Sequence, residues 1–560
     1  MLPDFFPKVP VQEPPRTGYT IRYTIQLRHC RIPPLSHQDK KPDTMHDTTL
    51  HARIVYFPSL VRCSLTLLVL SVAGILTPLS ASAAELMAGA AKVDITNRDV
   101  PLVNDPLYVK ALVIKEGDNT AAIVTVDAVA IGEIGSITNE YLDNVRGQIE
   151  KDLKIRPQNI MINASHCHGI VCNDVEQRTV QAIKEAAKKL VPVKVGVGTG
   201  HEDRVMENRR LFLKNGKEAD VRHAYSLPPD EEVAGIGPID PEIGILKLDT
   251  LDGETVAVVY NFACHPIQGV PNKGNTADMS GLASQVIEDN LSKDTIALFV
   301  QGCGGDINPV QYKDVDNPRD AEVLGNMLAL SALKAIRKIQ CTENSGLKVI
   351  NETLTLPRSN NEKRIAELKQ EQEQLLNSLQ GTSLNLKTFL PLIVKYKLYE
   401  ESPSYYSHRY MLEQKLGRDG LKKLDAENRA NMERYINNIY KMEKMSRNKA
   451  NLALLTKHQT RNQAAGKTID VEVVAFKLGD FRMITFPAEL TVNIGLNIKQ
   501  KSPFENTFVA GYTNGYNYYA PTADQLKNVG NAQEDSDCLF APEWQAIFEA
   551  KAHELIQQLK

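Results

Sequence analysis

The sequence has little net charge, few cysteines for its length and no zinc signature that can be read from a single segment. The formal net charge of the 560-residue chain is −3, which implies no general affinity for nucleic acid. Eight cysteines are present, too few for a disulfide scaffold in a chain of this length. The sequence contains no HExxH motif and no matched pair of CxxC motifs. Any metal site must therefore be assembled from residues far apart along the chain.

An apolar run near the N-terminus, Ser64 to Leu76, is too short to span a bilayer comfortably. Arg53 and Arg62 precede this run, and the small residues Ala81-Ser82-Ala83 follow it. This order predicts a secretory signal peptide cleaved after Ala83, and therefore a secreted or periplasmic protein. An uncleaved anchor helix is the alternative. Residues 1–44 are proline-rich without an apolar period and are either a disordered extension or a start-site artefact.

Strand-like and helix-like segments alternate beyond about Met87. The segments Leu107–Lys115 and Ala121–Ala130 are rich in β-branched residues and bounded by turn residues, which predicts strands. Val175–Leu190 has apolar residues at helical spacing, which predicts a helix. This mixture predicts an α/β fold with a mixed β-sheet core and flanking helices.

The character of the chain changes near Arg358, where it becomes polar and helix-rich as far as Gly466. Ser359 followed by Glu362 fits a capping box at the first helix of this region. Acidic and basic residues are interspersed, which favours a solvated helical arm over a nucleic-acid-binding one. We therefore predict an extension with signal peptide at 1–83, an α/β domain in two parts at 84–357 and 467–560, and an inserted helical arm at 358–466. The arm either carries a partner site or covers the functional site.

Four polar segments each follow a strand-like run: NASHCHG, NFACHPIQG, ITFPAEL and GYTNGYNYYAPT. Functional side chains tend to gather at strand ends, because the sheet holds the loops in fixed positions. Two histidines, a carboxylate and a phenol suit a borderline cation such as Zn²⁺. Cys167, Cys264 and Cys303 lie in or beside these segments, so a zinc site with Cys and His ligands is a rival. The alternation of side chains in an extended segment disfavours it, because Cys167 lies between two histidines. Hydrogen-bonded core histidines are the plainer alternative, and Tyr516 and Tyr518 are expected to be pocket wall or core.

These segments occur in a fixed order together with NTADMSG and LFVQGCGGDINP, and the whole set resembles the catalytic domain of the neutral/alkaline ceramidases. That family comprises non-lysosomal, zinc-dependent amidases of sphingolipid metabolism. The resemblance covers roughly Leu86–Cys341 and Thr468–Lys560, and it indicates a distant, bacterial-type member. The helical region lies between the two matching parts.

The resemblance implies a role for six residues. The implied zinc ligands are His166, His265, Glu489 and Tyr519. His168 would face the substrate, Arg209 in ENRR would contact it, and Tyr519 would also take part in catalysis. The implied reaction is attack of zinc-bound water on the amide of a small-molecule or lipid N-acyl substrate. In that reaction His168 and a tyrosine hydroxyl assist the developing oxyanion. A transient contact with a membrane surface is compatible with such a substrate.

The sequence departs from the family pattern at several points. Gly302 stands where those enzymes carry a serine, and Ala488 stands where they usually carry glycine. No segment up to Lys560 resembles their C-terminal immunoglobulin-like domain. Amide hydrolysis needs no serine nucleophile, but ceramide itself is not implied as the substrate. The remaining alternatives are a non-catalytic secreted binding or scaffold protein and a zinc esterase for a different class of substrate.

Overall fold

The computed structural model describes residues 85–220, 228–310, 319–344, 346–398, 408–527 and 532–560. The predicted signal peptide and its cleavage site after Ala83 lie outside these residues. The chain divides into two units, Met1–Leu79 and Ser80–Lys560, and every described element belongs to the second. Within the described ranges, no helix is both long and apolar enough to cross a membrane.

The larger of two central sheets has eight strands in the order β12-β11-β10-β5-β1-β2-β3-β4. The pairs β3–β4 and β11–β12 are parallel and the other pairs are antiparallel, so the sheet is mixed. Its strands are β1 (Leu86–Asp94), β2 (Tyr108–Glu116), β3 (Asn119–Val126), β4 (Ile160–Ala164), β5 (Val191–His201), β10 (Glu242–Thr250), β11 (Thr255–Phe262) and β12 (Ile296–Gln301).

A second sheet has four strands in the order β14-β15-β16-β18. They are β14 (Lys348–Pro357), β15 (Thr468–Leu478), β16 (Phe481–Thr485) and β18 (Thr507–Ala510). Short strands form three further small sheets around the polar loops. These strands are β6 (Met206–Asn208) with β13 (Ile307–Pro309), β17 (Glu489–Leu490) with β19 (Tyr519–Ala520), and β7 (Arg210–Leu213) between β8 (Glu218–Asp220) and β9 (Val233–Ile236).

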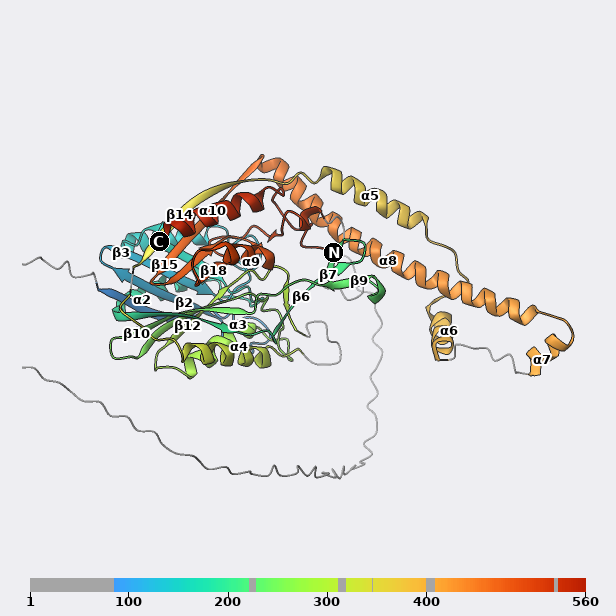
Figure 1. Ribbon diagram of the computed structural model, residues 1–560, viewed down its shortest axis with the longest axis horizontal. Coiled ribbons are helices and arrows are strands. Elements are labelled where there is room, and N and C mark those ends of the chain that lie inside the picture. The colour runs from blue at the N-terminus through green and yellow to red at the C-terminus, as the bar shows by residue number, and fades with distance from the viewer. Residues whose placement is uncertain (1–84, 221–227, 311–318, 345, 399–407, 528–531) are drawn as a thin grey trace, which may run out of the picture. The chain divides into compact units, whose positions relative to one another are not determined.

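Helices cover the outer faces of the two sheets (Figure 1). One group packs on the larger sheet and the other on the second sheet. The first group is α1 (Tyr141–Leu153), α2 (Val175–Lys188), α3 (Asp278–Asp289) and α4 (Ala321–Ile336); the second is α9 (Val492–Lys501) and α10 (Trp544–Gln558). The predicted class, a mixed sheet core with flanking helices, is confirmed, and the second sheet adds a layer that the sequence did not indicate.

The two sheets pack directly against each other, which explains why their strands read as almost continuously apolar. In β2, Val109 and Val113 face the helices, whereas Leu112 and Ile114 face the second sheet. This alternation is the two-residue period of a strand buried on both faces. Gly244 of β10 lies under Phe508 of β18, where an added Cβ would come within 2.2 Å of the ring. The glycine therefore permits the close contact between the sheets.

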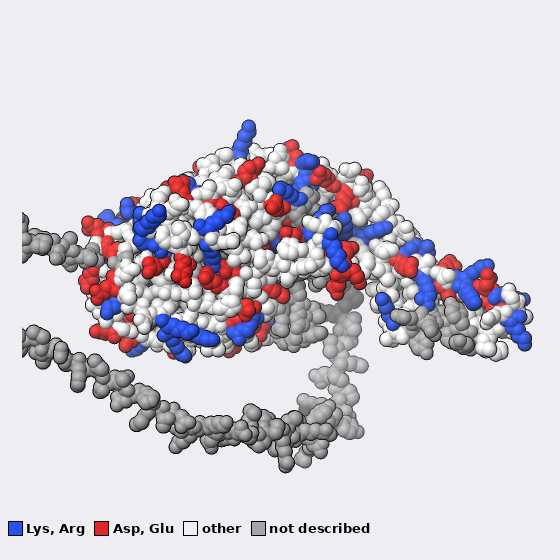
Figure 2. Space-filling view, in the orientation of Figure 1, with Lys and Arg blue, Asp and Glu red and all other residues white. Residues whose placement is uncertain are grey.

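The helical arm, residues 358–466, connects the neighbouring antiparallel strands β14 and β15, whose last ladder pair is Pro357 with Thr468. Its described helices are α5 (Glu362–Asn377), α6 (Leu386–Leu398), α7 (His408–Lys415) and α8 (Gly420–Ala465). On the face shown in Figure 2, acidic and basic side chains are interspersed over the surface.

The capping box predicted for the start of the arm is wrong. Asn361 occupies the N-cap of α5, and the backbone N–H of Glu362 donates to Oδ1 of Asn360 at 3.0 Å. The hydroxyl of Ser359 instead accepts a hydrogen bond from Asn462 of α8 at 3.0 Å. A contact between the two ends of the arm has therefore replaced the local cap.

Candidate metal centre and active site

The segment after β4 forms the first wall of the site. His166 lies just beyond the parallel pair β3–β4, and its backbone N–H donates to the carbonyl of Ala128 at 3.0 Å. Its φ is +68°, a left-handed conformation that is uncommon for a residue with a side chain. Such conformations tend to persist at functional sites, where the surroundings enforce them. Nδ1 of the ring lies 2.6 Å from the carbonyl oxygen of Val129, which can only accept a hydrogen bond. Nδ1 therefore carries the proton, and Nε2 presents a lone pair.

The loop after β11 places His265 in the same arrangement. Its Nδ1 lies 3.0 Å from the carbonyl oxygen of Ile307, so Nδ1 is again the donor. Its Nε2 lies 3.0 Å from Oε2 of Glu489. The centroids of the two imidazole rings are 4.8 Å apart. Both histidines thus direct Nε2 to one point, a feature of metal-binding histidines oriented by a second hydrogen bond.

Glu489 of β17 supplies the third group. Its Oε2 lies 3.5 Å from Nε2 of His166, and the hydroxyl of Tyr512 donates to the same oxygen at 3.3 Å. Tyr516 donates a hydrogen bond to Oε1. Burial raises the pKa of Glu489, but the positive charge that His166 and His265 can carry and the hydrogen bonds outweigh it, so the net pKa is lowered. The carboxyl group is therefore an anion under ordinary conditions.

These three side chains fit a divalent cation. The described residues contain one group of His, Cys, Asp and Glu side chains of this kind, and its potential ligand atoms all lie within 4.8 Å of one another. Burial lowers the pKa of His166 to about 4, against an opposing effect from Glu489, so the imidazole is neutral at neutral pH. Two imidazoles and one carboxylate form a known ligand set for catalytic zinc. The predicted ligands His166, His265 and Glu489 are thus brought together.

Tyr519, the fourth predicted ligand, lies beside this cluster. The parallel pair β17–β19 places it directly opposite Glu489 in the ladder. Its phenolic oxygen accepts a hydrogen bond from Nη2 of Arg209 at 3.2 Å. The guanidinium is oriented by Glu534, whose carboxylate lies 2.7 Å from Nε, and by Asn308, 3.2 Å from Nη1. The roles of Tyr519 in metal binding and catalysis remain predictions.

All six predicted site residues line one cavity of about 360 Å³. His168 contributes to its wall, with its ring centroid 5.5 Å from that of His166. His168 and Ile267 also line a larger neighbouring cavity of about 940 Å³. His168 is therefore positioned between the metal cluster and a space large enough for a substrate.

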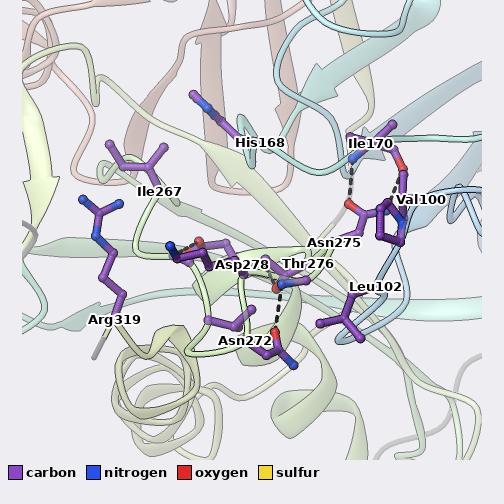
Figure 3. A pocket seen from close by; sticks show the side chains of 15 residues that line it. Val100, Leu102, His168, Ile170, Ile267, Asn272, Asn275, Thr276, Asp278 and Arg319 are labelled. Carbon is purple, nitrogen blue, oxygen red and sulfur yellow. Dashed lines mark hydrogen bonds between the residues drawn. The ribbon is translucent and has the colours of Figure 1, made fainter. Parts of the chain in front are cut away.

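Figure 3 shows the larger cavity, with His168 and Ile267 on one side and Val100, Leu102 and Ile170 on the other. Asn275 closes the loop beneath Ile170, because its Oδ1 accepts from the Ile170 N–H at 2.7 Å and its Nδ2 donates to the Ile170 carbonyl at 2.8 Å.

The carboxylate of Asp278 accepts hydrogen bonds from the backbone N–H groups of Gly269 and Gln268. Burial raises its pKa to about 6. Asp278 therefore holds the loop at Gln268 and Gly269 in place.

The loop that carries Tyr512, Asn514 and Tyr518 is held in a strained conformation, with φ values of 52°, 60° and 59° at these three residues. Asn514 anchors this loop to β4, because its Oδ1 accepts from the N–H of Ile162 at 2.8 Å and its own N–H donates to the Ile162 carbonyl. The loop and the histidine segment therefore support each other across the site.

The base of the arm reaches the cavity through residues that the sequence did not single out. Lys457 of α8 lines the cavity wall, with its Nζ 4.1 Å from the centroid of the Tyr518 ring. One turn further on, Arg461 forms an ion pair with Glu133 that lowers the pKa of that carboxyl. Asp537 also lines the cavity, and its Oδ1 lies 2.6 Å from Nε2 of His458. The predicted alternative in which the arm covers the functional site is therefore closer to the structure, because α8 forms part of the wall.

The rival cysteine site does not form among the described residues. Cys167 is buried but is absent from the metal-binding group and from the cavity lining. Burial raises the pKa of its thiol well above the usual range, which disfavours the thiolate that a metal needs. All six described cysteines are free, so this part of the chain contains no disulfide.

No family model matches the chain. Among solved structures, the fold is similar to neutral ceramidase from Pseudomonas aeruginosa, with a TM-score of 0.53 and 15% sequence identity over 85% of this chain and 75% of that one. It is similar to a ceramidase complexed with C2, with a TM-score of 0.54 and 16% identity over the same shares of the two chains. This likeness confirms, at the level of the fold, the resemblance that the motif order indicated.

Proposed function

We propose that this protein is an exported, zinc-dependent hydrolase that cleaves the amide bond of an N-acyl substrate, as the ceramidases of similar fold do. The observation that supports this proposal most directly is the buried group of His166, His265 and Glu489 at a cavity lined by His168, Arg209 and Tyr519. The apolar run Ser64 to Leu76, with the small residues that follow it up to Ala83, supports the proposed export.

In this proposal His166, His265 and Glu489 hold the ion. Zinc bound there would polarise a carbonyl and make a water molecule more acidic at neutral pH. The backbone carbonyls of Val129 and Ile307 keep both imidazoles in the tautomer that leaves Nε2 available. Tyr516 fixes the carboxylate of Glu489 through its hydroxyl. The three side chains are therefore preorganised before any ion or substrate arrives.

The remaining side chains act on the substrate. The oxygen of Tyr519 accepts a hydrogen bond from Arg209, and we assign the Tyr519 O–H as a donor to the substrate carbonyl oxygen as negative charge develops there. His168 lies between the two cavities, where its imidazole would take up the proton that the attacking water loses and pass it to the leaving amine. The larger cavity receives the acyl portion, since a volume of about 940 Å³ and walls containing Leu102, Ile170 and Ile267 suit an apolar chain.

The proposal is tested by metal analysis of the purified chain together with hydrolysis of a fluorogenic N-acyl amide. We expect one zinc ion per chain and turnover that is lost in His265→Ala. Matched ester and phosphoester substrates distinguish an amidase from the other hydrolases that the same metal supports. One zinc ion per chain without turnover of any of these substrates would contradict the enzyme proposal and favour a binding protein.

A further inference from the structure

Helix α6 of the arm (Leu386–Leu398) has two apolar faces, of which one is covered. On the covered face, Phe389 is 7% exposed and its ring stacks on that of Tyr435 in α8, with centroids 4.4 Å apart. Further along the same face, the guanidinium of Arg429 lies 4.5 Å from the centroid of the Tyr396 ring. These contacts attach α6 to α8 and orient the rest of the helix.

The other face carries a stripe of four large aliphatic residues. Leu386, Leu390, Val394 and Leu398 are spaced four residues apart, so they follow one another along one side of the helix. Their exposed fractions are 59%, 50%, 53% and 78%. Isolated exposed aliphatic residues are common on protein surfaces, but a continuous row of them marks an interaction surface.

The charges on α6 are all of one sign. Lys387, Lys395 and Lys397 belong to the helix, and it contains no acidic residue. The whole chain, in contrast, is nearly balanced, with 65 basic and 68 acidic residues. The exposed aliphatic stripe therefore shares its helix with three basic side chains and with no acidic one.

We propose that α6 docks on an anionic lipid surface through this stripe. Aliphatic side chains enter the boundary between headgroups and acyl chains, while long lysine side chains extend to the anionic headgroups. A helix of 13 residues is about 20 Å long, too short to cross a bilayer but sufficient to lie along its surface. Neither the stripe nor the lysines belong to the proposed metal site, so the inference does not depend on amide hydrolysis.

Co-sedimentation of the full chain with lipid vesicles tests this inference. We expect the protein to partition onto phosphatidylcholine vesicles that contain phosphatidylglycerol, and to bind weakly to phosphatidylcholine alone. Leu390→Ser with Val394→Ser should reduce the partition coefficient on the order of tenfold, because two aliphatic side chains no longer leave water. Lys387→Glu, Lys395→Glu and Lys397→Glu together should remove the preference for the anionic vesicles.

A matched control is available on α4, where Val323 and Leu330 are 54% and 62% exposed. Val323→Ser with Leu330→Ser makes the same chemical change on an exposed helix outside the arm and should leave vesicle binding unchanged. Equal partition of the wild type and the α6 variants would overturn the inference, as would equal binding to neutral and anionic vesicles. If the α6 variants changed the oligomeric state of the protein without lipid, but not its binding to vesicles, the inference would also be overturned. The stripe would then be an interface between two copies of the chain.

Discussion

At the residue scale, the orientation of the two histidines depends on two backbone carbonyls. The Nδ1 atoms of His166 and His265 face the carbonyls of Val129 and Ile307 at 2.6 and 3.0 Å, so neither ring needs a metal to fix its tautomer. Each Nε2 is then directed to the carboxylate of Glu489. The centre is therefore formed by the fold, and binding an ion requires little rearrangement.

We predict that His166→Ala and His265→Ala each lose the bound metal while the protein keeps its fold. Each change removes one of three ligands, and two ligands hold zinc far more weakly than three. The measurement is zinc per chain by mass spectrometry after dialysis, with circular dichroism as the check on folding. His201→Ala serves as the control, because that side chain is 66% exposed and lies outside the cavity. Full zinc occupancy in either ligand variant would contradict the assignment.

We predict that Tyr516→Phe weakens metal binding by about 10–100-fold, the usual effect of removing a hydrogen bond to a ligand. The Tyr516 hydroxyl donates to Oε1 of Glu489, and the ring itself is retained in the variant. Competition with a chromogenic chelator measures the change. Tyr518→Phe is the matched control, because its hydroxyl donates to Glu133 at 3.3 Å rather than to Glu489. Equal losses in the two variants would mean that the loop as a whole, and not the hydrogen bond, is responsible.

The sequence predicted individual residues well where a strand-end motif carried them. His166, His168, His265 and Glu489 each follow a strand-like run, and the structure brings them to one cavity. The sequence contains no motif that points to Lys457, because this residue reaches the cavity only through the packing of α8 against the polar loops. Contacts of this kind depend on tertiary structure and leave no local pattern to read.

At the scale of elements, the arm has a part that touches the site and a part that does not. Lys457 and Arg461 near the end of α8 contact Tyr518 and Glu133 at the cavity. Further out, Asn448 of α8 donates to Glu371 of α5 at 3.0 Å. Beyond that pair, the N–H of Gln380 donates to Oδ1 of Asn438 at 3.0 Å, so these two positions are neighbours.

We predict that replacing residues 381–437 with a short Gly/Ser linker leaves metal content unchanged and amide hydrolysis within about threefold, since distant sites seldom couple. The deletion removes α6, α7 and the first 18 residues of α8, and it retains the contacts of Lys457 and Arg461. Zinc analysis and the initial rate with the fluorogenic amide measure the effect.

Removal of the whole arm, residues 358–466, is the comparison. It should also spare the zinc, because His166, His265 and Glu489 all lie outside the arm, but it should slow hydrolysis because the Lys457 wall is lost. Loss of zinc in this second variant would show that the arm builds the metal centre.

At the scale of the whole molecule, the class of fold could be predicted, but its layering could not. Segments such as β2 and β15 are both rich in buried apolar residues, and a strand buried on both faces gives the same pattern in either sheet. Which strands pair is decided by contacts between distant segments, such as Phe508 against Gly244. The alternation of strands and helices therefore identified an α/β fold without separating the two sheets.

The metal centre also joins parts of the molecule that are distant in sequence, since its groups follow β4, follow β11 and lie in β17. An ion that binds only the folded chain stabilises it by mass action, by about 2.7 kcal/mol when its concentration is a hundred times its Kd. We therefore predict that a strong chelator lowers the thermal unfolding temperature on the order of 3 °C. Differential scanning calorimetry of wild type and His166→Ala, with and without chelator, measures this shift. The variant should unfold at one temperature in both conditions, because it has no ion to lose, and an identical chelator effect on both proteins would place the stabilising ion elsewhere.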